Sequence, residues 1–160
     1  DPIGSRGLGD VYKRQGQTIT IDCPNINPDF DMHISGLATI HLTAVPTFDG
    51  GQVFVEMQDA QTGMRVGHAT MDVRYHAGGS EPQTVTPGDA VTMMMEFQAI
   101  DAIIPAGNGL RFFLTDTGED YLAPACGTAC VLHVLPSMST FEAPLIERDG
   151  SNTLIVPMYQ

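Results

Sequence analysis

Short runs of alternating side chains dominate this chain from residue 34 onward. Val53, Val55 and Met57 occupy every second position of one run, and Leu110, Phe112 and Leu114 do so in another. Because successive side chains of a β-strand point to opposite faces, each run can bury one face and expose the other. The runs span residues 34–44, 52–58, 69–76, 91–98, 110–115, 129–135 and 153–156.

Turn sequences separate these runs. Asp49-Gly50-Gly51, Gly78-Gly79-Ser80 and Pro87-Gly88 supply glycine where the chain must reverse, and the stretch from Cys23 to Phe30 is predicted to be a loop. No stretch keeps a helical period. Short strands at regular spacing with turns between them predict an all-β sandwich or barrel.

The first fifteen residues lack this alternation. Residues 5–15, which end in Asp10-Val11-Tyr12-Lys13-Arg14-Gln15, resemble the in-frame translation of a sequencing adapter. We therefore expect residues 1–15 to be non-native and disordered. One β-domain is then expected over residues 16–160, with its core at 34–146, as part of a longer reading frame.

The formal net charge of −12 excludes one class of partner. A nucleic-acid backbone would be repelled, so we expect no nucleic-acid partner. No apolar run reaches the roughly 18–20 residues of a membrane span, so we expect no membrane partner either.

Five short features mark the borders of the predicted strands. They are Ile34-Ser35-Gly36, the pair Asp59 and Gly63, Arg74 beside Tyr75, Pro87-Gly88, and the segment Ile104-Pro105-Ala106-Gly107-Asn108-Gly109-Leu110-Arg111-Phe112. In this order they resemble the C-terminal domain of X-Pro dipeptidyl-peptidases and of related cocaine esterase-like CocE/NonD hydrolases. The resemblance covers residues 34–146. It departs from the common pattern at Asn108, where histidine is usual, and at Gly109, where arginine is usual.

The resemblance implies a jelly-roll, galactose-binding-like β-sandwich. In that family the domain packs on an α/β-hydrolase domain that carries the Ser-Asp-His triad. The function expected is therefore that of a non-catalytic domain that shapes the substrate cleft of a serine hydrolase, with oligomers forming through the parent protein. The alternative is a stand-alone carbohydrate- or protein-binding module, although the chain has no Trp for a sugar platform.

The residues themselves predict no catalytic, cofactor or metal site. The sequence has no Gly-x-Ser-x-Gly nucleophile turn, and Ser80 follows two glycines without a helix after it. His133 lies in phase with core positions, and no histidine pair has ligand spacing. The acidic segment from Asp116 to Asp120 is expected to be a solvated turn rather than a calcium loop.

Cys126 and Cys130 flank three residues and are a candidate disulfide. Their separation is compatible with the Cα–Cα distance that a disulfide needs. Two free thiols, or half of a zinc site with Cys23 as a third ligand, are the alternatives.

Four residues are candidates for an interface with the missing hydrolase domain: Arg74, Arg111, Asn108 and Met94. Each arginine is predicted within a strand and could pair with an acid such as Asp72 or Glu96, or bridge to the other domain. Met94 would belong either to an exposed methionine-rich face, near Phe113 if those strands pair, or to a strand buried on both faces.

Overall fold

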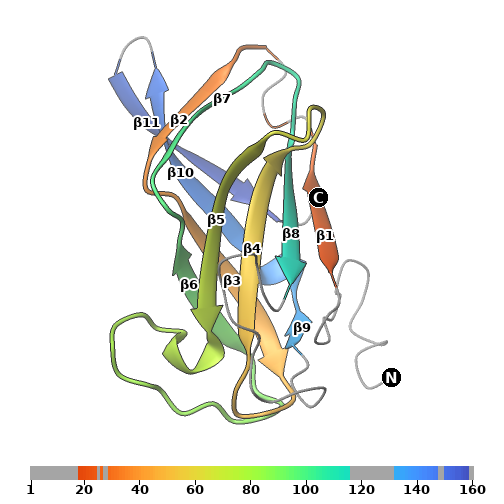
Figure 1. Ribbon diagram of the computed structural model, residues 1–160, viewed down its shortest axis with the longest axis vertical. Helices are drawn as coiled ribbons and strands as arrows, with labels where there is room; N and C mark the ends of the chain where they lie inside the picture. The colour runs from red at the N-terminus through yellow and green to blue at the C-terminus, as the bar shows by residue number, and fades with distance from the viewer. Residues whose placement is uncertain (1–17, 25, 27–28, 116–131, 148–149, 159–160) are drawn as a thin grey trace.

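A computed structural model of the chain describes residues 18–24, 26, 29–115, 132–147 and 150–158. In this part of the chain, β-strands and two single-turn 3-10 helices build two sheets that lie face to face (Figure 1). The predicted all-β sandwich is confirmed. None of the described residues form a helix long and apolar enough to cross a membrane.

The smaller sheet has four strands among the described residues, all antiparallel, in the order β1-β8-β4-β5. These are β1 (Ile19–Cys23), β8 (Leu110–Thr115), β4 (Gln52–Asp59) and β5 (Arg65–Asp72). A 3-10 helix, η1 (Val73–Tyr75), follows β5 directly.

The larger sheet has seven strands among the described residues. Its main order is β6-β3-β10-β2-β7, and β11 pairs with β10 while β9 pairs with β3. The strands are β2 (Met32–Gly36), β3 (Thr39–Pro46), β6 (Val91–Glu96), β7 (Ile100–Ile104), β9 (Leu132–Val134), β10 (Thr140–Glu147) and β11 (Gly150–Pro157). A second 3-10 helix, η3 (Pro136–Met138), separates β9 from β10.

Three phenylalanines join the two sheets in the core. Phe141 of β10 meets Phe97 edge to face at 5.7 Å between ring centroids, and meets Phe112 of β8 at 5.3 Å. All three rings are almost fully buried. Gly67 of β5 leaves room for Ile100 and Phe97, whose nearest atoms lie 3.0 and 3.4 Å from where a Cβ would stand. Aromatic contacts therefore connect the two sheets within the core.

One edge of β10 carries two strands in succession. β2 pairs with β10 at Leu145 and Ile146, and β3 pairs with it from Thr140 to Glu142. Between these pairings the chain turns at Gly36, which has φ +126°. Pro144 of β10 lies opposite this turn, and because proline has no backbone N–H it has no ladder bond to lose there.

Strand pairing along β3 is also interrupted where η3 separates β9 from β10. Thr43 of β3 makes hydrogen bonds to the chain at this interruption. Its backbone N–H donates to Ser139 Oγ at 2.9 Å, and its hydroxyl donates to the carbonyl of Met138 at 3.0 Å. Ser139 Oγ in turn donates to the carbonyl of Leu135 at 2.8 Å. These buried polar groups are therefore paired where the strand ladder is interrupted.

Two predicted elements differ from the structure. The run 34–44 is two strands rather than one, because the positive φ of Gly36 breaks the extended chain. The run 69–76 ends as a strand at Asp72, because the Asp72 carboxylate accepts the backbone N–H of Arg74 and starts a 3-10 turn. Arg74 is thus in η1, and its prediction within a strand was wrong.

Three strands were not expected from the sequence. β1 includes Cys23, so the predicted loop begins one residue later than expected. β7 has only five residues. β10 contains Pro144, and a proline in a sequence argues against a central strand unless the pairing of the neighbouring strands is known. Pro144 can lie within β10 because neither β2 nor β3 pairs with β10 at that residue.

We predict that Phe141→Ala destabilises the fold by about 3–5 kcal/mol, because it removes a ring packed between the two sheets. Denaturant unfolding followed by circular dichroism measures this change. Phe48→Ala, at an exposed position outside the strands, should change stability by no more than about 0.5 kcal/mol. Equal effects of the two substitutions would contradict the central position of Phe141.

We also predict that Gly36→Ala costs about 1–3 kcal/mol, because alanine is strained at this backbone conformation. A Cβ there would lie 2.9 Å from Pro144 Cγ, which adds a steric clash. Gly50→Ala is the matched control, since no atom lies within 4 Å of its Cβ position. The same unfolding midpoint for Gly36→Ala and Gly50→Ala would refute this account of the break.

Candidate functional site

Arg74 forms an ion pair with Asp72, the residue that caps the N-terminus of η1. Its Nη2 donates to Asp72 Oδ2 at 2.7 Å and its Nε donates to Asp72 Oδ1 at 3.1 Å. Burial raises the pKa of Asp72, but the bonds from Arg74 outweigh it and the net pKa is lowered. The pairing with Asp72 predicted from the sequence is therefore confirmed.

Arg111 pairs with an acid that the sequence did not single out. It lies on the outer face of β8, and its Nε is 2.5 Å from Asp22 Oδ1 on the neighbouring strand β1. The predicted pairing with an acid is confirmed, but neither of the two examples, Asp72 and Glu96, is the partner. Both arginines proposed for the interface therefore already have a carboxylate partner in the described part of the chain.

Asn108 binds a buried carboxylate. Its Nδ2 donates to Asp59 Oδ2 at 3.0 Å and to Oδ1 at 3.2 Å, while Asp59 is 1% exposed. Asp59 Oδ1 also accepts the backbone N–H groups of Gln61 and Thr62 at 2.9 and 3.0 Å. Burial raises the pKa of Asp59, but the hydrogen bonds from Asn108, Thr62 and Gln61 prevail and lower it.

Gly109 explains the second departure from the family pattern. A Cβ at this position would overlap the carbonyl oxygen of Cys23 and lie 2.8 Å from Pro24 Cα. Its backbone N–H donates to Gln61 Oε1 at 2.7 Å, and its carbonyl accepts from Ala60. Only glycine fits where the end of β1 passes this loop, so Asn108 and Gly109 together tie the β4–β5 hairpin to β8.

Met94 is exposed on the outer face of β6, which decides between the two alternatives in favour of an exposed position. Its neighbour is His41 of β3, because β6 pairs with β3 and not with β8. The conditional contact with Phe113 does not form, since Phe113 lies in the other sheet. The predicted interface residues thus lie apart, with Met94 on one sheet and Arg111 and Asn108 on or beside the other.

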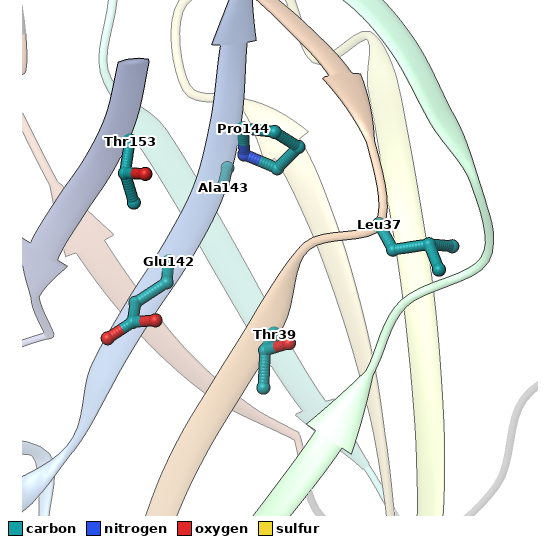
Figure 2. Close-up of a pocket in the computed structure, with 6 residues that line it drawn as sticks. All are labelled: Leu37, Thr39, Glu142, Ala143, Pro144 and Thr153. Carbon is teal, nitrogen blue, oxygen red and sulfur yellow. The ribbon is translucent and has the colours of Figure 1, made fainter. Parts of the chain in front are cut away.

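An open depression of about 220 Å³ lies on the outer face of the larger sheet. Figure 2 shows Glu142 and Pro144 on β10, Thr153 across on β11, and Leu37 and Thr39 where the chain passes from β2 to β3. The depression lies where the pairing of β10 passes from β2 to β3. Its walls combine aliphatic carbon with two hydroxyls and one carboxylate.

The cysteine predictions fall mostly outside the described residues. Cys126, Cys130 and the segment 116–120 lie in the part that the structure does not describe. Cys23 is buried, and burial, together with the charge of Asp22, raises the pKa of its thiol to about 11. It is therefore protonated at neutral pH in the metal-free chain. Its alternative as a third zinc ligand stays a prediction, because the other two cysteines lie outside the described residues. The described residues contain no group of three metal-ligating side chains.

The sequence patterns missed the apolar outer face that surrounds the depression. Ile103, Ile146 and Ile155 are each half or more exposed on β7, β10 and β11. A signal was present in the run from Ile100 to Ile104, where an isoleucine occupies the position expected to be polar. The strand was too short for the alternation to be recognised.

We predict that Asn108→Ala destabilises the protein by about 1–3 kcal/mol at pH 7, because it leaves the buried Asp59 carboxylate short of donors. The folded pKa of Asp59 lies below 3.8, so its ionised form contributes stability above this value. That contribution is lost progressively below about pH 5 as the carboxylate is protonated. The difference between wild type and Asn108→Ala should therefore shrink between pH 5 and pH 3.

Urea unfolding across this pH range measures the difference. Gln98→Ala, which removes an exposed amide, is the control and should have little effect at any pH. A loss for Asn108→Ala that stays constant with pH would show that Asn108 acts through packing alone.

Comparison with known proteins identifies solved structures that share this fold. No curated protein sequence matches the chain. Among solved structures, an aminopeptidase from a marine sediment Thaumarchaeota archaeon aligns with a TM-score of 0.60 at 9% identity, over 86% of this chain and 28% of that one. A selenomethionine-labelled α-amino acid ester hydrolase aligns with a TM-score of 0.57 at 13% identity, over 92% of this chain and 27% of that one.

These similarities establish the fold, and this chain spans less than a third of either relative. The family comparison is more specific. Residues 29–125, more than half of the chain, match the family described as the X-Pro dipeptidyl-peptidase C-terminal non-catalytic domain. The resemblance drawn from the five ordered features is confirmed, and the chain belongs to this family of non-catalytic domains.

Proposed function

We propose that this chain is the C-terminal domain of a serine hydrolase of the X-Pro dipeptidyl-peptidase or CocE type. The observation that carries the proposal is the family match over residues 29–125, a family whose description is itself non-catalytic. The absence of a Gly-x-Ser-x-Gly turn from the sequence agrees with it. The chemistry then belongs to a separate α/β-hydrolase domain.

In this proposal the domain packs on the hydrolase domain and forms part of the wall of its substrate cleft. Substrate sites often lie at domain interfaces, where two surfaces enclose a concave space. Two structural relatives are named as an aminopeptidase and an amino acid ester hydrolase, and most of each polypeptide lies outside the aligned region. A hydrolase of amides or esters next to an amino acid residue is the activity that we infer for the whole protein.

The carbohydrate-binding alternative gains no support from the exposed aromatic rings. Phe30 and Phe48 are exposed in the described part of the chain, but they precede β2 and follow β3. Because β2 and β3 run one after the other along β10, these two rings lie at opposite ends of the sandwich. They cannot form one flat platform for a sugar.

The test begins with long sequencing reads across the proposed junction at Gly16, which show whether a reading frame continues upstream. We predict that it encodes an α/β domain with a Gly-x-Ser-x-Gly turn. The longer polypeptide should then hydrolyse a dipeptidyl Xaa-Pro p-nitroanilide or an amino acid p-nitrophenyl ester. Deleting residues 16–160 should lower both kcat/KM and the melting temperature of what remains.

Two controls accompany this measurement. Replacing the upstream nucleophile by alanine should abolish hydrolysis, and the 160-residue chain alone should have no activity. If an unrelated domain lies upstream, or the longer polypeptide hydrolyses neither substrate class, the proposed function is wrong. Retention of the chain on insoluble polysaccharide would then support the binding-module alternative.

A further inference from the structure

The two outer faces of the sandwich differ in their exposed apolar side chains. Among the described residues, six large hydrophobic side chains on or beside the larger sheet are between 50% and 61% exposed: Leu37, Met94, Ile103, Met138, Ile146 and Ile155. The strands of the smaller sheet contribute none to this exposed set. The exposed hydrophobics that remain, such as Phe48 and Met64, lie outside the strands.

Strand register brings the apolar side chains together on the larger sheet. Ile146 of β10 and Ile103 of β7 flank His33 of β2, so the three side chains form one row across the outer face. Directly opposed side chains of neighbouring strands lie about 5 Å apart. This row therefore places two exposed isoleucines on either side of His33, which is itself paired with Asp101 of β7, at one end of the sheet.

The charges of the two faces differ as well. Each of the three arginines in the described residues lies on or beside the smaller sheet and is paired there: Arg65 with Glu56 at 3.0 Å, Arg74 with Asp72, and Arg111 with Asp22. No lysine or arginine of the described part lies on the larger sheet. The smaller sheet thus has the paired charges of a face in contact with water.

The larger sheet has one such pair, His33 with Asp101, and two further carboxylates for which the described residues show no basic partner. Glu96 of β6 and Glu142 of β10 stand on either side of Thr39 in one cross-strand row. At the usual strand spacing their positions are about 10 Å apart. Glu142 lines the depression, whose aliphatic walls are Leu37 and Pro144 (Figure 2).

We infer that the outer face of the larger sheet is the surface on which the hydrolase domain of the same polypeptide docks, and that Glu142 binds a lysine or arginine side chain of that domain in the depression. This inference rests on the proposed function. The aliphatic stem of such a side chain would lie against Leu37 and Pro144 while its charged end meets the carboxylate.

Charge selects this occupant over a second copy of the chain. Two copies docked face to face would bring the Glu96 and Glu142 carboxylates of both toward one another without a described cation to offset them. A partner with an apolar surface and a basic side chain complements the face. More than two thirds of each structural relative lies outside the aligned region, which leaves ample chain for such a partner.

Methionine oxidation tests the docking face. Met94 and Met64 are 51% and 44% exposed, and they lie on the larger sheet and next to the start of β5 in the smaller sheet. Peroxide should oxidise both at similar rates in the 160-residue chain. In the longer polypeptide, oxidation of Met94 should slow by about tenfold while that of Met64 changes little, as peptide mass spectrometry would measure.

A charge reversal tests the role of Glu142. In the longer polypeptide, Glu142→Arg should return Met94 to the oxidation rate of the chain alone. Glu81→Arg, the same change at an exposed loop position, should leave Met94 protected. An unchanged unfolding midpoint of the 160-residue chain with Glu142→Arg confirms that the variant folds.

The outcomes separate this inference from the proposed function. An active hydrolase in which Met94 oxidises as fast as in the chain alone, or in which Met64 is protected in its place, overturns the docking face. If Met94 remains protected in the Glu142→Arg variant, the inference that Glu142 binds a lysine or arginine of the hydrolase domain is wrong. An upstream region without a hydrolase domain overturns the proposed function itself.

Discussion

The larger sheet depends on the way β10 accepts β2 and β3 along one edge. Gly36 turns the chain between those strands at a φ of +126°, and Pro144, which has no N–H to donate, lies opposite the turn. A residue with a side chain at position 36 would clash with Pro144, and a residue with an N–H at position 144 would face an interrupted ladder. The two residues are therefore suited to each other, and the depression beside Glu142 is a direct consequence of the break.

The sandwich separates two kinds of surface on its two outer faces. Arginine–carboxylate pairs cover the smaller sheet, whereas half-exposed aliphatic side chains and carboxylates cover the larger one. Because the fold is shared by proteins with different activities, it does not by itself specify a role. The asymmetry of the faces is the feature of this chain that favours a domain docked on a partner over an independent module.

The departures from the family pattern become intelligible once the loop before β8 is in place. Asn108 donates both contacts to the buried Asp59 carboxylate, and Gly109 lets the end of β1 pass within contact distance. Both residues contribute to joining the β4–β5 hairpin with β8 and β1. This chain thus uses an amide and a missing side chain where histidine and arginine are usual, and the resulting contacts are internal.

Alternation along the sequence determined the all-β class, the buried phase of strands such as Val53–Met57 and Leu110–Leu114, and, through five ordered features, the family. It also placed Arg74 beside Asp72, since those residues are neighbours in the chain. Only the tertiary structure decided that Arg111 meets Asp22, 89 residues away, that Met94 lies beside His41, and that Asn108 binds Asp59. The physical reason is that side-chain period specifies which residues share a face of one strand, while the neighbour of that strand depends on contacts between segments far apart in sequence.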